Sequence, residues 1–136
     1  MTTVMAFGTF DLLHPGHKYF LRQAKKQGDY LIAVIARDST VKKLKHELPS
    51  QSEKTRQRAV LRLNLADKAI LGDRGINKYA VIKKHRPDII CLGYDQIYFI
   101  DGLKDKIKQF KFNTKIIRLK PYQAHKYKTS IIKKQS

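Results

Sequence analysis

The residues best placed to do chemistry in this sequence are two histidines, His14 and His17, which stand three positions apart in the segment GTFDLLHPGH. The segment follows a short apolar run at 3–7 and precedes a stretch at 17–27 that has no Gly or Pro before Gly28 and carries apolar residues at helical spacing. Imidazoles at the entrance of a helix can converge on one anion, and the first helical amides add partial positive charge there. The spacing is therefore compatible with a phosphate-binding function.

The neighbours of the two histidines favour the same interpretation. Gly8 and Gly16 permit close approach of the backbone to a phosphate, and Pro15 fixes the turn before the helix. On spacing alone the pair is also compatible with two solvated side chains or with half of a metal site, for which Asp11 is the only close carboxylate.

The elements around this segment alternate in type. Because ligands of an open α/β sheet bind beyond the carboxyl ends of the strands, where strand order reverses, the segment after the first strand is where chemistry is expected. The alternation predicts an α/β fold with a doubly wound, Rossmann-like parallel sheet and right-handed crossovers. We predict strands at 3–7, 30–36, 68–71, 88–92 and 114–119, helices at 17–27, 38–45, 52–65, 76–85 and 101–110, and a final helical turn at 128–134.

Length and composition limit the alternatives. The 136 residues, of which 42% are hydrophobic, predict one compact domain over 1–136. No apolar run is long enough to span a membrane, and the N-terminus does not resemble a signal peptide. The single cysteine, Cys91, has no partner for an internal disulfide and stands in an apolar run, so it is predicted to be buried. These features predict a cytoplasmic protein without a membrane partner.

The formal charge of +18 indicates affinity for something anionic, which could be nucleic acid, a membrane surface or small phosphates. The basic residues are spread along the chain, and no zinc-finger, RNP-like or KH-like pattern accompanies them. A basic nucleic-acid-binding module nevertheless remains an alternative to an enzyme, as does a regulatory protein that binds a nucleotide without turning it over.

The whole segment GTFDLLHPGH resembles the signature of the cytidylyltransferase-like nucleotidyltransferases, in which His14-Pro15-Gly16-His17 is the HxGH motif. HRPDIICLGYDQ, at 85–96, is similar to the strand and loop of that family that approach the nucleotide. KTSIIKK, at 128–134, is loosely similar to its final phosphate loop. The resemblance implies transfer of a nucleotidyl group from ATP or CTP to a phosphorylated acceptor, with release of pyrophosphate and with Mg²⁺ bridging the phosphates.

The resemblance also implies roles for particular residues. It assigns catalysis to His14, His17, Lys43 and Arg56, acceptor binding to Lys45, and proximity to the metal to Asp11. The lysines and Arg56 are equally typical of solvated helix faces. The residues that it assigns to nucleotide binding are Gly8, Thr9, Phe10, Asp11, Gly16, Gly93, Asp95, Gln96, Thr129 and Ser130.

Two subfamilies compete for the substrate. The strings ARDSTVKKLK and ADKAILGD, and the DQ after the fourth strand, are similar to archaeal-type FAD synthases, which adenylylate FMN. Glycerol-3-phosphate cytidylyltransferases share GTFDLLH, but this chain lacks their RTEGIST string and has no tryptophan. The resemblance therefore predicts ATP and FMN as substrates, with cytidylyl transfer from CTP to a phosphoalcohol as the alternative, and a homodimer as the assembly.

Overall fold

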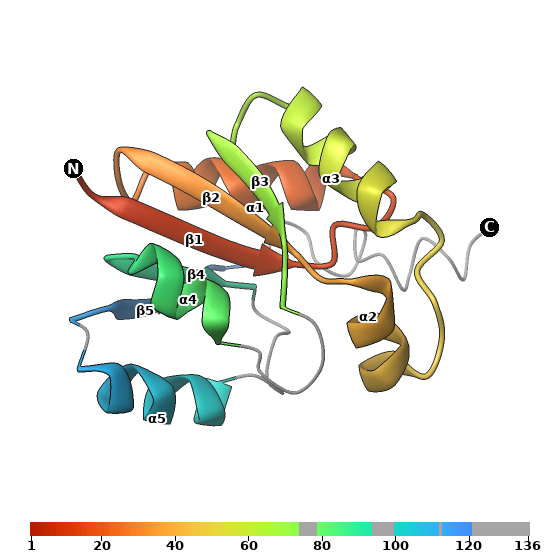
Figure 1. Ribbon diagram of the computed structural model, residues 1–136. Helices are drawn as coiled ribbons and strands as arrows, with labels where there is room; N and C mark the ends of the chain where they lie inside the picture. The colour runs from red at the N-terminus through yellow and green to blue at the C-terminus, as the bar shows by residue number, and fades with distance from the viewer. Residues whose placement is uncertain (74–78, 94–99, 112, 121–136) are drawn as a thin grey trace.

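The structure is a computed structural model that describes residues 1–73, 79–93, 100–111 and 113–120 (Figure 1). Strands and helices alternate along this part of the chain, so the predicted α/β order is confirmed. The elements are β1 (Thr3–Gly8), α1 (Pro15–Lys25), β2 (Tyr30–Ile35), α2 (Asp38–Lys45), α3 (Glu53–Arg62), β3 (Lys68–Leu71), α4 (Ala80–His85), β4 (Ile89–Leu92), α5 (Ile100–Phe110) and β5 (Lys115–Arg118).

The strands form one parallel sheet in the order β3-β2-β1-β4-β5. The chain builds outward from β1 through β2 to β3, and then crosses back to place β4 against the other side of β1. Strand order therefore reverses between β1 and β4, and the loops after these two strands flank the crevice where such sheets bind ligands. The prediction of a doubly wound sheet is confirmed.

Helices cover both faces of the sheet. Buried side chains of α1 and α3 pack on one face, and those of α4 and α5 pack on the other (Figure 1). Successive side chains of β1 point to opposite faces, so Val4 and Ala6 pack with the first helix pair, whereas Met5 packs on the second face. Burying a side chain the size of Val4 or Met5 contributes roughly 1.5–3 kcal/mol. Because the strands are covered on both faces, their sequences are continuous apolar runs.

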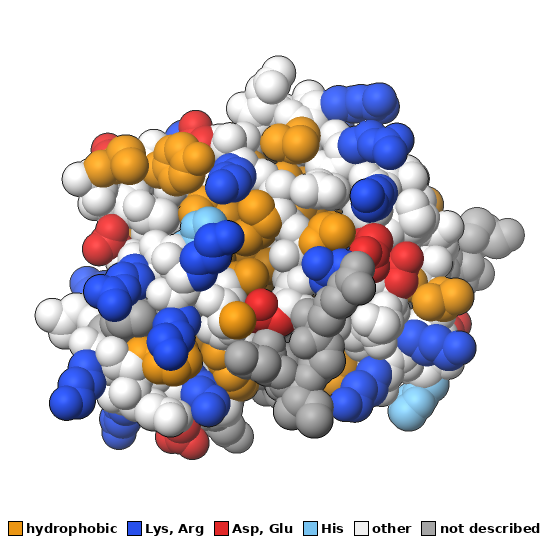
Figure 2. All heavy atoms as spheres, in the orientation of Figure 1, with side chains coloured by type: hydrophobic (Ala, Val, Ile, Leu, Met, Phe, Trp, Pro, Cys, Tyr) orange, Lys and Arg blue, Asp and Glu red, His pale blue; other side chains and the backbone are white. Residues whose placement is uncertain are grey.

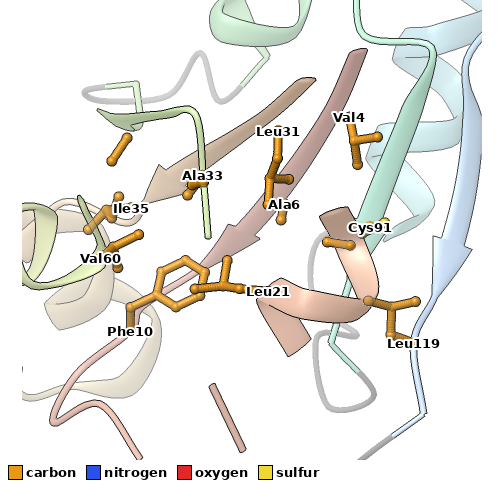
Figure 3. Packing of buried hydrophobic residues seen from close by; sticks show 13 residues of the cluster. Val4, Ala6, Phe10, Leu21, Leu31, Ala33, Ile35, Val60, Cys91 and Leu119 are labelled. Carbon is orange, nitrogen blue, oxygen red and sulfur yellow. The ribbon is translucent and has the colours of Figure 1, made fainter. Parts of the chain in front are cut away.

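The first of these layers includes Cys91, together with Leu21 and Val60 (Figure 3). Burial raises the pKa of the Cys91 thiol to about 11, so the side chain is a protonated, small apolar group. The predicted burial of Cys91 is confirmed. Among the described residues, no helix has the length and apolar character that crossing a bilayer requires.

The helix boundaries differ from the predictions at a few points. The helix predicted at 17–27 runs from Pro15 to Lys25, because a histidine cap starts it early. The helix predicted at 76–85 is described from Ala80 to His85, since 74–78 lie outside the described residues, as does the predicted final turn at 128–134. Ser52 caps α3 as predicted, and its Oγ accepts a hydrogen bond from the Thr55 N–H at 3.3 Å.

Candidate active site

His14 and His17 together cap the N-terminus of α1. The Nδ1 of His14 accepts a hydrogen bond from the Gly16 N–H at 3.1 Å, and the His14 N–H donates to the Nδ1 of His17 at 3.4 Å. The centroids of the two rings are 3.9 Å apart. The imidazoles thus form the reciprocal cap that Ser and Glu side chains usually provide, which satisfies backbone donors that the first helical turn leaves without partners.

This cap fixes the tautomer of both rings. Because each Nδ1 accepts a hydrogen bond, the proton of each neutral ring belongs on Nε2. The first turn of α1 contains no acidic residue, so nothing in it opposes the partial positive charge of the helix terminus. The histidine pair therefore presents Nε2–H donors where an anion is already favoured.

The electrostatics keep the pair neutral. Burial is the main cause that lowers the pKa of His17 to about 3, and the positive charges of His14 and Lys45 lower it further, against the opposing effect of Asp11. Burial also lowers the pKa of His14. At neutral pH both rings can consequently donate hydrogen bonds to phosphate oxygens without serving as a source of protons.

We expect the free energy of unfolding to fall as the pH is lowered from the ordinary histidine value of 6.5 toward the folded pKa of His17, about 3. In this window the unfolded chain binds a proton more readily than the folded chain, so the stability present above pH 6.5 is lost on acidification. Urea unfolding at several pH values would measure this. The stability difference between wild type and His17→Ala should shrink as the pH falls, and parallel pH profiles would contradict the prediction.

The loop between β1 and α1 is held in an unfavourable backbone conformation. Phe10 and Leu12 have φ angles of 54° and 53°, in the left-handed region that bulky residues rarely occupy. The Phe10 side chain is only 2% exposed and packs into the core beside Leu21 (Figure 3). Its ring lies against Gly8, where a Cβ would come within 2.9 Å, and its centroid is 5.9 Å from that of His17. Phe10 thus supports His17 from the core, and its predicted contact with the nucleotide stays a prediction.

Asp11 fastens this loop to the segment before α3. Its side chain is 2% exposed, and its Oδ2 and Oδ1 accept hydrogen bonds from the N–H groups of Ser50 and Gln51 at 2.7 and 2.9 Å. The Gln51 Oε1 in turn accepts from the Leu12 N–H at 3.2 Å. Both oxygens of this buried carboxylate are thus occupied by backbone amides, a geometry that favours a structural role, and the assignment of Asp11 to the metal stays a prediction.

Within the described ranges, no three His, Cys, Asp or Glu side chains are grouped to hold a metal ion. Mg²⁺ that enters with a triphosphate takes most of its ligands from phosphate oxygens and water. The expectation that such an ion accompanies the nucleotide therefore stays a prediction.

We expect Asp11→Asn to destabilise the fold by about 1–3 kcal/mol, because the amide NH₂ would face a backbone N–H that needs an acceptor. Denaturant unfolding would measure the loss. The Mg²⁺ concentration that gives half-maximal activity should stay the same in the variant. A large increase in the Mg²⁺ concentration needed for half-maximal activity would instead indicate that Asp11 is a metal ligand.

Arg56 is the buried centre of a second set of contacts. Its guanidinium is 0% exposed and donates to the carbonyl oxygens of Thr9 at 2.7 Å and Ala36 at 2.8 Å. It also donates to the Gln51 carbonyl at 3.0 Å and to the Asp38 carboxylate at 2.6 Å. These bonds tie the chain just after β1 to the chain just after β2. These contacts make Arg56 a positioning residue, and its predicted catalytic contact stays a prediction.

The structure separates the remaining predicted residues into groups. Thr9 lies after β1, and Gly93 lies after the neighbouring strand β4, so both flank the crevice. Lys45 lies at the rim of a cleft that Gly8 and Thr9 also line, whereas Lys43 is exposed and does not line that cleft. Four predicted nucleotide-binding residues lie outside the described residues, namely Asp95, Gln96, Thr129 and Ser130.

Sequence reasoning missed Asp38, Ser50 and Gln51, which hold the loop that carries the histidines. Nothing in the sequence marks these residues, because each partner lies 18 to 40 positions away along the chain.

A parallel α/β sheet with neutral imidazole donors at a helix N-terminus, beside the reversal of strand order, defines a phosphate-handling class of enzyme. The chain belongs to the cytidylyltransferase-like family, whose model matches residues 5–135, and it is a nucleotidyltransferase.

Its relatives are similar over most of their length. A protein of Aciduliprofundum boonei named FAD synthase is 45% identical over 122 residues, which cover 90% of this chain and 80% of that protein. An FAD synthase of Methanohalophilus mahii is 46% identical over 126 residues, covering 91% and 86%. The crystal structure of a Thermoplasma volcanium protein, described as a lipopolysaccharide core biosynthesis protein, matches with a TM-score of 0.83 at 40% identity, covering 90% and 99%.

Proposed function

We propose that this nucleotidyltransferase transfers the adenylyl group of ATP to FMN, forming FAD and pyrophosphate. The observation that carries the proposal is the similarity to proteins named FAD synthase, at 45–46% identity and over at least 80% of their length. The intact histidine pair, with its donors at the N-terminus of α1, supports turnover rather than binding alone.

In this reaction the protein needs mainly to align the two substrates and to stabilise negative charge on the phosphate oxygens. An oxygen of the FMN phosphate attacks the α-phosphorus of ATP, the bond from that phosphorus to the bridging oxygen breaks, and pyrophosphate leaves with the bonding electrons. A phosphate monoester has its second pKa near 6, so at neutral pH the nucleophile is already mostly ionised and needs no general base. Neutral imidazoles suit this reaction, since they donate hydrogen bonds without removing or supplying a proton.

Charge accumulates on the oxygens around the α-phosphorus during the transfer, and preorganised donors are most effective where charge develops. We assign this role to the Nε2–H groups of His14 and His17, aided by the terminus of α1. Lys45 supplies positive charge on the acceptor side. We propose that Mg²⁺ accompanies ATP and is held by phosphate oxygens and water, with no direct carboxylate ligand from Asp11.

On the face drawn in Figure 2, the charge distribution does not favour a nucleic-acid-binding module. Lys and Arg side chains are scattered over this face rather than gathered in one place. A scattered surface charge of this kind attracts small anionic substrates in general.

A pyrophosphate-release assay that crosses ATP and CTP with FMN and glycerol 3-phosphate tests the proposal. We expect the combination of ATP with FMN to give the highest kcat/KM. Faster turnover of CTP with glycerol 3-phosphate would overturn the choice of substrates and leave the reaction class intact.

A further inference from the structure

A cleft lies at the carboxyl ends of β1, β2 and β3, and residues of α2 and α4 complete its lining. Figure 1 shows where these elements lie in the fold. Its wall is mostly apolar and is formed by the side chains of Phe7, Val34, Val41, Leu44 and Val81. Phe7 and Val34 pack in the layer on the face of the sheet opposite α1, so the cleft and the histidine pair flank the β1 loop from opposite faces. Apolar clefts of this kind bind ligands that have apolar surface to bury.

The cleft is held in shape by hydrogen bonds outside its apolar lining. The Nε of Arg37, after β2, donates to the carbonyl oxygen of Gly72, after β3, at 2.7 Å. The N–H of Val81, in α4, donates to the Asp73 carboxylate at 3.2 Å. These bonds fix the spacing of the β2 loop, the β3 loop and α4, so a ligand would meet walls that need little ordering.

The cleft is continuous with the phosphate-binding end of the site. Gly8 and Thr9 line it and also begin the loop that leads to the histidines. Lys45 lies at its rim, and the charge of this ammonium contributes to the lowered pKa of His17, so the two groups are within electrostatic reach of each other. A molecule that has an apolar ring at one end and a phosphate at the other could therefore place its ring in the cleft and its phosphate between Lys45 and the imidazoles.

We propose that this cleft binds the isoalloxazine ring of FMN, and that Leu44 and Val81 select a flat aromatic acceptor over small phosphoalcohols. The inference rests on the proposed function and adds the location and chemistry of acceptor recognition. A phosphoalcohol carries no ring to fill the cleft, so the apolar lining would contribute nothing to its binding. The ribityl chain of FMN would link the ring to the phosphate along Thr9.

The first test narrows the cleft. Leu44→Phe and Val81→Phe would each place a phenyl ring in the space, whereas Leu63→Phe enlarges a half-buried leucine that packs against the core on the opposite face. Quenching of flavin fluorescence reports FMN affinity directly, without turnover. We expect the Kd for FMN to rise about tenfold or more in both cleft variants, the scale of overpacking a fitted site, and the KM for ATP to change less than about twofold. Leu63→Phe should bind FMN like wild type.

The second test uses the wild-type protein and so does not depend on how the variants fold. Lumiflavin, which has the isoalloxazine ring with a methyl group in place of the ribityl phosphate chain, should displace FMN and leave ATP binding unaltered. Failure of lumiflavin to displace FMN, or FMN affinities of the folded cleft variants equal to that of Leu63→Phe, would overturn the ring assignment. An enzyme that binds FMN in this way and yet does not adenylylate it would instead overturn the proposed function, so the two failures are distinguishable.

Discussion

Replacing His17 with alanine should lower kcat by about a hundredfold or more, the scale typical of losing one preorganised hydrogen-bond donor. The substitution removes an Nε2–H donor at the N-terminus of α1 and also the Nδ1 acceptor for the His14 N–H. His14 would thereby lose the contact that orients its ring, so both donors would be affected. Steady-state rates of FAD formation at saturating ATP and FMN would measure the loss.

The matched control is His85→Ala. His85 is also a partly buried histidine with a lowered pKa, but it ends α4 just before β4 and therefore lies toward the amino ends of the strands. Its replacement should leave kcat within about twofold of wild type, as for a change away from the reacting groups. Equal rates in the His17 and His85 variants would remove the catalytic role from the histidine pair.

Arg56→Met should cost about 1–3 kcal/mol of unfolding free energy, the loss expected when buried hydrogen-bond acceptors are left without their donor. The methionine fills most of the volume but leaves the Asp38 carboxylate without its cation, and leaves carbonyl oxygens such as those of Thr9 and Ala36 without donors. Urea-induced unfolding followed by circular dichroism would measure the change.

Arg58, two positions along the same helix, is exposed and provides the comparison. Arg58→Met should change stability by less than about 0.5 kcal/mol. Arg56→Lys should fall between the two, because an ammonium keeps the charge but cannot form the planar set of contacts that a guanidinium makes. Similar stabilities for the Met variants at 56 and 58 would contradict the positioning role of Arg56.

The fold could be predicted because each strand is marked in the sequence by its own short apolar run. The run at 30–36 is apolar on both faces and forms the interior strand Tyr30–Ile35, and Ser52 marks the start of α3 because its cap is local. The start of α1 was missed by two residues, since a histidine at N-cap is not among the residues that usually indicate a helix start.

The site could be predicted only where its residues are neighbours in sequence. His14 and His17 form their contacts within one turn, so their spacing is informative. The roles of Asp11 and Arg56 depend on partners that the fold brings from 39 and 47 positions away, to Ser50 and Thr9 respectively. A charged residue type predicts exposure or contact with substrate, and only tertiary structure reveals that both of these side chains face the backbone instead.

The two outer strands of the sheet, β3 and β5, each have four residues and carry charge at their ends. Lys68 begins β3, and Lys115 and Arg118 begin and end β5, all three exposed. Short edge strands with cationic side chains discourage a second copy of the chain from adding a strand to the sheet. Such pairing would bring like charges together and would form few backbone hydrogen bonds. If this enzyme pairs with a second copy, as its family resemblance predicts, we expect the copies to meet through helices or loops rather than through a sheet continued across the two chains.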